Sequence, residues 1–192
     1  MTVLRNTRLA LTPKAAPFAI RAEKASDVVA REALLDVCFG ENRHMRTCQR
    51  LRDGRMPAEG LAFSAMADGN PVGTLRLWHV SAGGIPALML GPLAVEASSH
   101  KLGAGTALMD HALAAATARG HRAVILLGDA PYYTRFGFSG ERMAALSLPG
   151  PFERERLLGL ELRAGALDGA RGLIVATGLV RPVRKAQRAR AA

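Results

Sequence analysis

The sequence has few cysteines and few aromatic residues, and it lacks any long apolar run. Only Cys38 and Cys48 are cysteines among 192 residues, and 5% of the chain is aromatic. Two cysteines cannot build the disulfide framework of a small secreted domain, and neither stands in a CxxC pair or near histidines at zinc-ligand spacing. The N-terminus has no apolar segment of signal-peptide length, and no stretch approaches the roughly 18 apolar residues of a transmembrane helix. We therefore predict a cytoplasmic protein without a metal site or membrane association.

Acidic residues are scarce at both ends of the chain. The 26 lysines and arginines exceed the 16 aspartates and glutamates by ten, and such an excess makes nucleic acid a candidate partner. Residues 1–17 carry +3 and residues 181–192 carry +5, whereas residues 18–180 carry only +2. The sequence therefore predicts one domain at 18–180 between a flexible basic N-terminal extension and a basic C-terminal tail. Nucleic acid is expected as a partner only of these ends.

Hydrophobic periodicity and turn residues predict a mixed α/β domain. Apolar residues recur at helical spacing after Ser26, which is expected to cap that helix. The segment Asp68-Gly69-Asn70-Pro71 is a turn sequence, so the strands on either side of it should form an antiparallel hairpin. Further helices are predicted at 103–119 and 131–136, and strands at 18–21, 61–66, 72–80, 87–95, 123–127, 157–162 and 173–176.

A break interrupts the most apolar predicted strand, ALMLGPLAV at 87–95. Its continuous apolar character is typical of a strand that is buried on both faces. Gly91-Pro92 stands in its middle, and proline cannot donate a hydrogen bond to a neighbouring strand. The strand is therefore expected to bulge at this point or to lose a partner there.

A glycine-rich segment, HKLGAGT at 100–106, stands before the second predicted helix. Helix N-termini expose unpaired N–H groups and a positive dipole end, and glycines let a phosphate approach the backbone. A P-loop is excluded because the motif GxxxxGK[ST] is absent. A dinucleotide-binding turn stays an alternative, since Asp129 ends the next strand. Against it, Leu108 occupies the third glycine position, and seven residues separate Val95 from Gly103.

Taken together, the bulged GPLAV strand, the glycine turn and the segment ILLGDAPYYTRFGF at 125–138 resemble the GNAT superfamily of acyl-CoA-dependent N-acetyltransferases. With PGPF and ELRAGAL further along, the chain is similar to the YhbS-like bacterial branch over about residues 18–176. The resemblance implies a GNAT-like, mostly antiparallel twisted sheet flanked by helices, with a bulged central strand splayed at the acyl-CoA site. His100 departs from the pattern, because the superfamily usually has Gln or Arg at this position.

The same resemblance implies where acetyl-CoA would bind. Backbone N–H groups of the glycine turn would hold the pyrophosphate of coenzyme A, with added charge from Lys101. Unpaired backbone groups of Leu93 and Val95, after the bulge, would hydrogen-bond the pantetheine amides, and no metal is implied. The implied cofactor-binding residues are Leu93, Ala94, Val95, His100, Lys101, Leu102, Gly103, Ala104, Gly105 and Thr106.

Tyr133 lies four residues before Gly137-Phe138, where the superfamily usually has its general acid. A tyrosine keeps its proton at neutral pH and can donate it to a departing thiolate. Tyr132 is expected to face the sheet, although a shift of one residue would exchange the two roles. The base is not identified: the sequence leaves His79, Asp129 and a chain of water molecules as alternatives, with Glu41 and His44 as further candidates in a loop on the acceptor side.

Residues 43–55 carry five arginines against Asp53 alone, a charge of +4. They are expected to form a short, solvated, basic helix that ends near Gly54. In similar proteins the first two helices flank the acceptor cleft, so this charge predicts a neutral or acidic amine acceptor and disfavours a polycation. A solvated surface with no functional role is the alternative.

These features predict an enzyme, an N-acetyltransferase that moves an acetyl or short acyl group from acetyl-CoA to a primary amine by direct attack in a ternary complex. The alternative is a noncatalytic module on the same fold, which binds acyl-CoA or associates with RNA or the ribosome. A monomer or a homodimer is expected.

Overall fold

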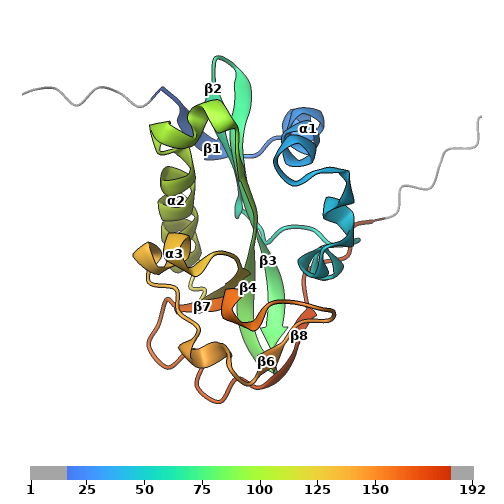
Figure 1. Ribbon diagram of the computed structural model, residues 1–192, viewed down its shortest axis with the longest axis vertical. Coiled ribbons are helices and arrows are strands. Elements are labelled where there is room, and N and C mark those ends of the chain that lie inside the picture. The colour runs from blue at the N-terminus through green and yellow to red at the C-terminus, as the bar shows by residue number, and fades with distance from the viewer. Residues whose placement is uncertain (1–16, 183–192) are drawn as a thin grey trace, which may run out of the picture.

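The computed structural model describes residues 17–182, and the predicted basic ends lie outside the described residues except for their innermost positions. A twisted sheet forms the centre, with helices on both sides (Figure 1). α1 (Val28–Phe39) and two short 3₁₀ helices lie on one side, and α2 (Ala104–Ala118) and α3 (Ala130–Tyr133) on the other. The predicted α/β class, a mostly antiparallel sheet flanked by helices, is confirmed. No helix within residues 17–182 is long and apolar enough to cross a membrane.

The sheet is antiparallel apart from two parallel pairs. Its strands run in the order β1-β2-β3-β4-β5-β7, and β8 pairs with the far end of β3 and with β6. The parallel pairs are β4 with β5 and β6 with β8. Every predicted strand is present, and only the two-residue β6 had no sequence signal. The strands are β1 (Ala19–Ala22), β2 (Ala62–Ala67), β3 (Asn70–Ala82), β4 (Ile85–Val95), β5 (Ala123–Leu127), β6 (Leu146–Ser147), β7 (Leu157–Glu161) and β8 (Gly172–Ala176).

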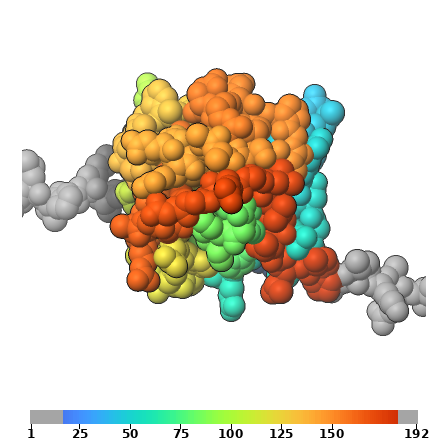
Figure 2. Space-filling model, turned by 90° about the horizontal axis from the view of Figure 1, so that it is seen from below, coloured from blue at the N-terminus to red at the C-terminus, as the bar shows by residue number. Residues whose placement is uncertain are grey.

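The central strands are buried on both faces because side chains alternate across a strand. In β3, Leu77 belongs to the hydrophobic cluster that α2 covers, whereas its neighbour Trp78 belongs to a second cluster on the opposite face. Met143 and Leu167, from the C-terminal part of the chain, complete this second cluster. Seen from below, C-terminal segments in orange and red surround the green end of the β3–β4 hairpin (Figure 2). This double burial explains the continuous apolar runs of β4 and β5.

The predicted irregularity of β4 is confirmed. Leu77 of β3 pairs with Leu90 and Leu75 pairs with Leu93, so Gly91 and Pro92 together oppose a single residue of β3. On its other side, β4 pairs with β5 only through Leu88 and Met89, and the two strands then separate. The bulge and the separation occur at the same place, and they open the sheet between β4 and β5.

Two local predictions were wrong. Ser26 lies inside a short 3₁₀ helix (Ala25–Asp27), and Asp27 occupies the N-cap position of α1. The buried Asp27 carboxylate accepts the Lys24 N–H at 2.8 Å and thereby caps the 3₁₀ helix, not α1. Residues 43–55 do not form one solvated helix. They fold as η2 (Glu41–Met45) and η3 (Thr47–Leu51), because burial of Cys48 and Leu51 against the sheet turns the second segment inward.

A buried ion-pair network fixes α1 against the sheet. The Glu23 carboxylate accepts hydrogen bonds from Arg31 of α1 at 2.6 Å and from Arg76 of β3 at 2.7 Å, and the three side chains are at most 10% exposed. Removing the shared carboxylate leaves the buried Arg76 without an ionic partner, while Arg31 keeps its pair with Glu32. Glu23→Gln is therefore expected to lower the free energy of unfolding by about 3 kcal/mol in denaturant titrations. The exposed Glu59→Gln serves as the control, and equal effects of the two variants would contradict the network's role.

Candidate active site

Two adjoining cavities open where β4 and β5 separate. One has a volume of about 600 Å³ and extends toward α1, η2 and η3. The other, of about 540 Å³, extends toward the N-terminus of α2. Leu93, Asp129 and Tyr133 border both cavities. These three residues therefore mark the place where the contents of one cavity would meet those of the other.

The cavity beside α2 gathers most of the residues implied for coenzyme A. Gly103 begins α2 in the left-handed conformation with φ of 81°, which glycine adopts at little cost. Ala94 and Ala104 are buried in the core, and Lys101 and Leu102 are exposed in η4 (Ala97–Leu102). Because η4 separates β4 from α2, the dinucleotide-binding alternative, which needs a helix directly after its strand, is not supported. The residues that border the cavity are Leu93, Val95, His100, Gly103, Gly105, Thr106, Asp129, Tyr132, Tyr133 and Arg135.

His100 is turned toward the protein. Its Nε2 atom lies 2.8 Å from the carbonyl oxygen of Val95, and the Cys38 Sγ atom lies 3.5 Å from the same oxygen. Val95 is one of the two strand residues implied for pantetheine. In this conformation the His100 ring therefore contacts the Val95 carbonyl, a backbone group of the groove.

The two tyrosines of α3 point to different parts of the site. A Cβ atom added to Gly105 would lie 2.9 Å from the Tyr132 hydroxyl, so this side chain covers the first turn of α2 and not the sheet. Tyr133 packs against Gly128 and Phe138 and borders both cavities. Burial raises the pKa of Tyr133 to about 12. The Tyr133 hydroxyl is therefore protonated at neutral pH.

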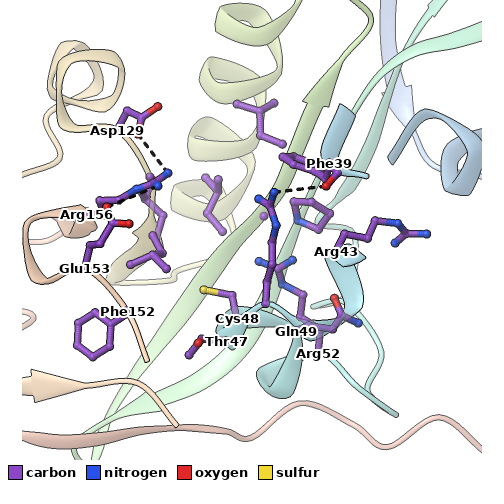
Figure 3. Close-up of a pocket in the computed structure, with 18 of the residues that line it drawn as sticks. Phe39, Arg43, Thr47, Cys48, Gln49, Arg52, Asp129, Phe152, Glu153 and Arg156 are labelled. Atoms are coloured by element: carbon purple, nitrogen blue, oxygen red, sulfur yellow. Dashed lines mark hydrogen bonds and ion pairs between the residues drawn. The ribbon is translucent and has the colours of Figure 1, made fainter. Parts of the chain in front are cut away.

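The cavity beside α1 lies between two walls (Figure 3). One wall comes from the end of α1 with η2 and η3, and the other from the residues after β5 and before β7. The sequence indicated the second wall only through Asp129 and the PGPF segment, whereas Glu153 and Arg156 stand in no motif. The labelled residues of the first wall are Phe39, Arg43, Thr47, Cys48, Gln49 and Arg52, and those of the second are Asp129, Phe152, Glu153 and Arg156.

The candidate bases are separated by the fold. Asp129 borders both cavities, where Arg156 pairs with it at 3.1 Å. His79 borders a different cavity beside His121, with 5.4 Å between the ring centroids, so it is too far from the site to act as its base. Glu41 and His44 are exposed and do not border the larger cavities. Among the described residues, no group of three or more potential ligands could hold a metal ion.

A splayed β4–β5 pair with a glycine turn at the start of α2 defines an acyl-CoA acyltransferase fold, and the comparisons with known proteins agree. The model of the GNAT acetyltransferase family matches residues 29–138, more than half of the chain. The chain belongs to this family. No curated protein sequence matches the chain.

Several solved structures share this architecture. The GNAT N-acetyltransferase YhbS from Escherichia coli, solved with CoA, is 27% identical with a TM-score of 0.73, over 88% of this chain and 94% of that one. A GNAT acetyltransferase from Brucella melitensis, solved with acetyl-CoA, is 26% identical with a TM-score of 0.54, over 80% and 99% of the two chains. Ard1 from Thermoplasma volcanium is 17% identical with a TM-score of 0.55, over 76% and 97% of the two chains, and it supports the fold alone. The protein is therefore an acyl-CoA-dependent acyltransferase, and it is similar in sequence and fold to YhbS.

Proposed function

We propose that the protein is an N-acetyltransferase that transfers an acetyl or short acyl group from acetyl-CoA to a primary amine. The observation that carries this proposal is the position of Tyr133, which borders both cavities. Acetyl-CoA would occupy the cavity beside α2, and the amine acceptor would enter the cavity beside α1.

The residues beside α2 fit coenzyme A. The 15-residue helix α2 begins at Ala104, and Gly103, Gly105 and Thr106 at its N-terminus border the groove. The first N–H groups of a helix are unpaired, so this end of α2 favours a pyrophosphate. The edge of β4 at Leu93 has no neighbour in β5, which leaves room for the pantetheine arm. Arg135, whose guanidinium lies 4.5 Å from the ring centre of Tyr132, borders the same groove and adds a positive charge.

Acetyl-CoA would supply the activated thioester, and the chain positions the reactants and supplies a proton. In the transfer, a bond forms between the amine nitrogen and the carbonyl carbon while the bond from carbon to sulfur breaks. Tyr133 donates its hydroxyl proton to the departing sulfur and later regains a proton from solvent. The proton of the attacking amine leaves through the open cavity, either to water or to the carboxylate of Asp129. Both electrons of the broken bond stay with sulfur, so free thiol is a product.

The pH dependence follows from the pKa of Tyr133. An acid with a pKa of about 12 keeps its proton throughout the range in which an acceptor amine becomes neutral. We expect kcat/KM for the acceptor to rise with pH and not to fall again below about pH 11. A falling limb near pH 8 that disappears in Tyr133→Phe would contradict this assignment.

Two measurements separate the enzyme from a noncatalytic module. Calorimetry with acetyl-CoA should show binding in either case, whereas only the enzyme should release thiol when amines are added. Failure of every amine to produce thiol, despite binding of acetyl-CoA, would favour the noncatalytic alternative. For the RNA-associated version, deletion of residues 181–192 should abolish an association that weakens steeply with salt.

We also propose the boundaries and setting of the enzyme. Residues 18–180 form the catalytic domain, with residues 1–17 and 181–192 as basic extensions outside it. Two unpaired cysteines, Cys38 and Cys48, fit a reducing compartment, the cytoplasm. The protein acts as a monomer or a homodimer, which sedimentation analysis would distinguish.

A further inference from the structure

The acceptor cavity contains arginines of two kinds. Arg43 pairs with Glu32 and Asp36, both at 2.6 Å, and Arg156 pairs with Asp129 on the opposite wall. Arg46 and Arg52 also border the cavity. Within residues 17–182, no carboxylate forms an ion pair with either of them.

Arg52 lies next to the point at which the sheet opens. Its Nη2 atom is 3.1 Å from the position of a Cβ atom added to Gly91, so the guanidinium rests against the bulge of β4. Its Nε atom is buried and has no hydrogen-bond partner among the described residues. An unpaired donor on a cation is costly to bury. The surroundings of Arg52 are therefore incomplete without an acceptor group.

Arg46 adds a second positive charge. Its guanidinium lies 5.0 Å from the centre of the Phe39 ring, and Nη2 donates to the Phe39 carbonyl at 3.4 Å. Burial is the main cause that lowers the pKa of Arg52; the charges of Cys48 and Asp53 oppose this shift, and the charge of Arg46 adds to it. Two guanidinium groups that repel each other beside one cavity are stabilised by an anion between them.

We propose that Arg46 and Arg52 bind a carboxylate on the acceptor, so that the substrate is a small amino acid or a similar amine that carries a carboxylate. This inference rests on the N-acetyltransferase function proposed above. Guanidinium forks match a carboxylate in geometry as well as charge, and a cavity of about 600 Å³ is the size of a small-molecule site.

Arg46 and Arg52 lie where they could orient the acceptor for the reaction. Tyr133 borders the same cavity from the side opposite η3, beside the gap between β4 and β5. A carboxylate held at Arg46 and Arg52 anchors one end of the acceptor and leaves its amine free to reach that gap. The same charges repel a diamine, whose second ammonium would occupy the anchoring position.

Matched acceptors test the proposal directly. The probes are ω-amino acids from glycine to 6-aminohexanoate, each compared with its carboxamide, its aminoalkylphosphonate and the diamine of equal length. With acetyl-CoA as donor, kcat/KM from thiol release should be about 10- to 100-fold higher for the best carboxylate than for its carboxamide. The diamine should be poorer still, and the phosphonate tests whether any anion suffices.

Variants assign the preference to the arginines. Arg52→Gln and Arg46→Gln should each raise KM for the carboxylate acceptor about tenfold and reduce its advantage over the carboxamide. Arg163→Gln removes an exposed positive charge that borders neither cavity and should retain the full preference. If Arg52→Gln is poorly folded, Arg46→Gln at the exposed position still tests the charge. Arg52→Lys then keeps the charge and tests the guanidinium geometry, and it should also raise KM for the carboxylate acceptor.

The outcomes distinguish this inference from the proposed function. Equal turnover of the carboxylate and the carboxamide would overturn the inference and leave the proposed N-acetyltransferase function intact. Preference for the phosphonate over the carboxylate would have the same meaning. The enzyme could instead react faster with a dicarboxylic acyl-CoA such as succinyl-CoA and show no preference for acceptor charge. That result would mean that the two arginines bind the acyl donor, and it would also overturn the inference. If no amine is acetylated, binding of butyrate and not butyramide, lost in Arg52→Gln, would still support the anion site. Equal binding of the two would refute it.

Discussion

Tyr133→Phe is expected to lower kcat about 10²- to 10⁴-fold, the usual contribution of general acid catalysis. Tyr133 borders both cavities, and the variant keeps the ring that packs against Gly128 and Phe138 and removes only the hydroxyl. Steady-state thiol release should therefore show the loss in kcat, while calorimetry should show acetyl-CoA binding within a few-fold of the original. Thermal unfolding of the two proteins should be similar.

The neighbouring tyrosine provides the comparison. Tyr132→Phe alters the side chain that covers the first turn of α2, so its effect should fall on acetyl-CoA affinity, with less than about a tenfold change in kcat. If kcat falls in Tyr132→Phe and not in Tyr133→Phe, the roles of the two residues are exchanged. Unchanged turnover in both variants would remove a tyrosine acid from the mechanism.

Gly103→Leu is expected to weaken acetyl-CoA binding by at least about tenfold. Gly103 has a left-handed backbone with φ of 81° and borders the groove at the start of α2, so a side chain there would obstruct the proposed pyrophosphate site. Each hydrogen bond from these N–H groups to a charged oxygen contributes about 1.5 to 3 kcal/mol. Calorimetry with acetyl-CoA measures the loss.

Gly120 at the other end of the same helix is the matched control. It has φ of 77°, and a Cβ atom there, as at Gly103, would meet no atom within 4 Å. Gly120→Leu should therefore suffer the same backbone strain, about 1 to 2 kcal/mol, and a comparable fall in melting temperature. Equal affinity for acetyl-CoA in the two variants would show that the turn at Gly103 is not the phosphate site.

The elements that the sequence predicted correctly are those whose conformation depends on residues close together in the chain. Strands β2 to β5 follow from apolar runs and turn residues, and α2 follows from one apolar stripe that ends at Gly120. The bulge at Gly91-Pro92 follows from the missing N–H of proline. The prediction for residues 43–55 was wrong because their pattern was interpreted as an isolated surface helix. Packing of Cys48 and Leu51 against the sheet sets the conformation of this segment instead.

The sequence by itself determined the order of strands and helices, the break in β4, the glycine turn and the tyrosine that follows β5. Each of these depends on backbone geometry or on a motif within a few residues. Only the tertiary structure decided which charges share the acceptor cavity. It separates His79 from the site and brings Arg52 against Gly91, about forty positions further along the chain. Electrostatic interactions act through space, and proximity between distant segments arises only when the sheet packs, so no local pattern could specify this cavity.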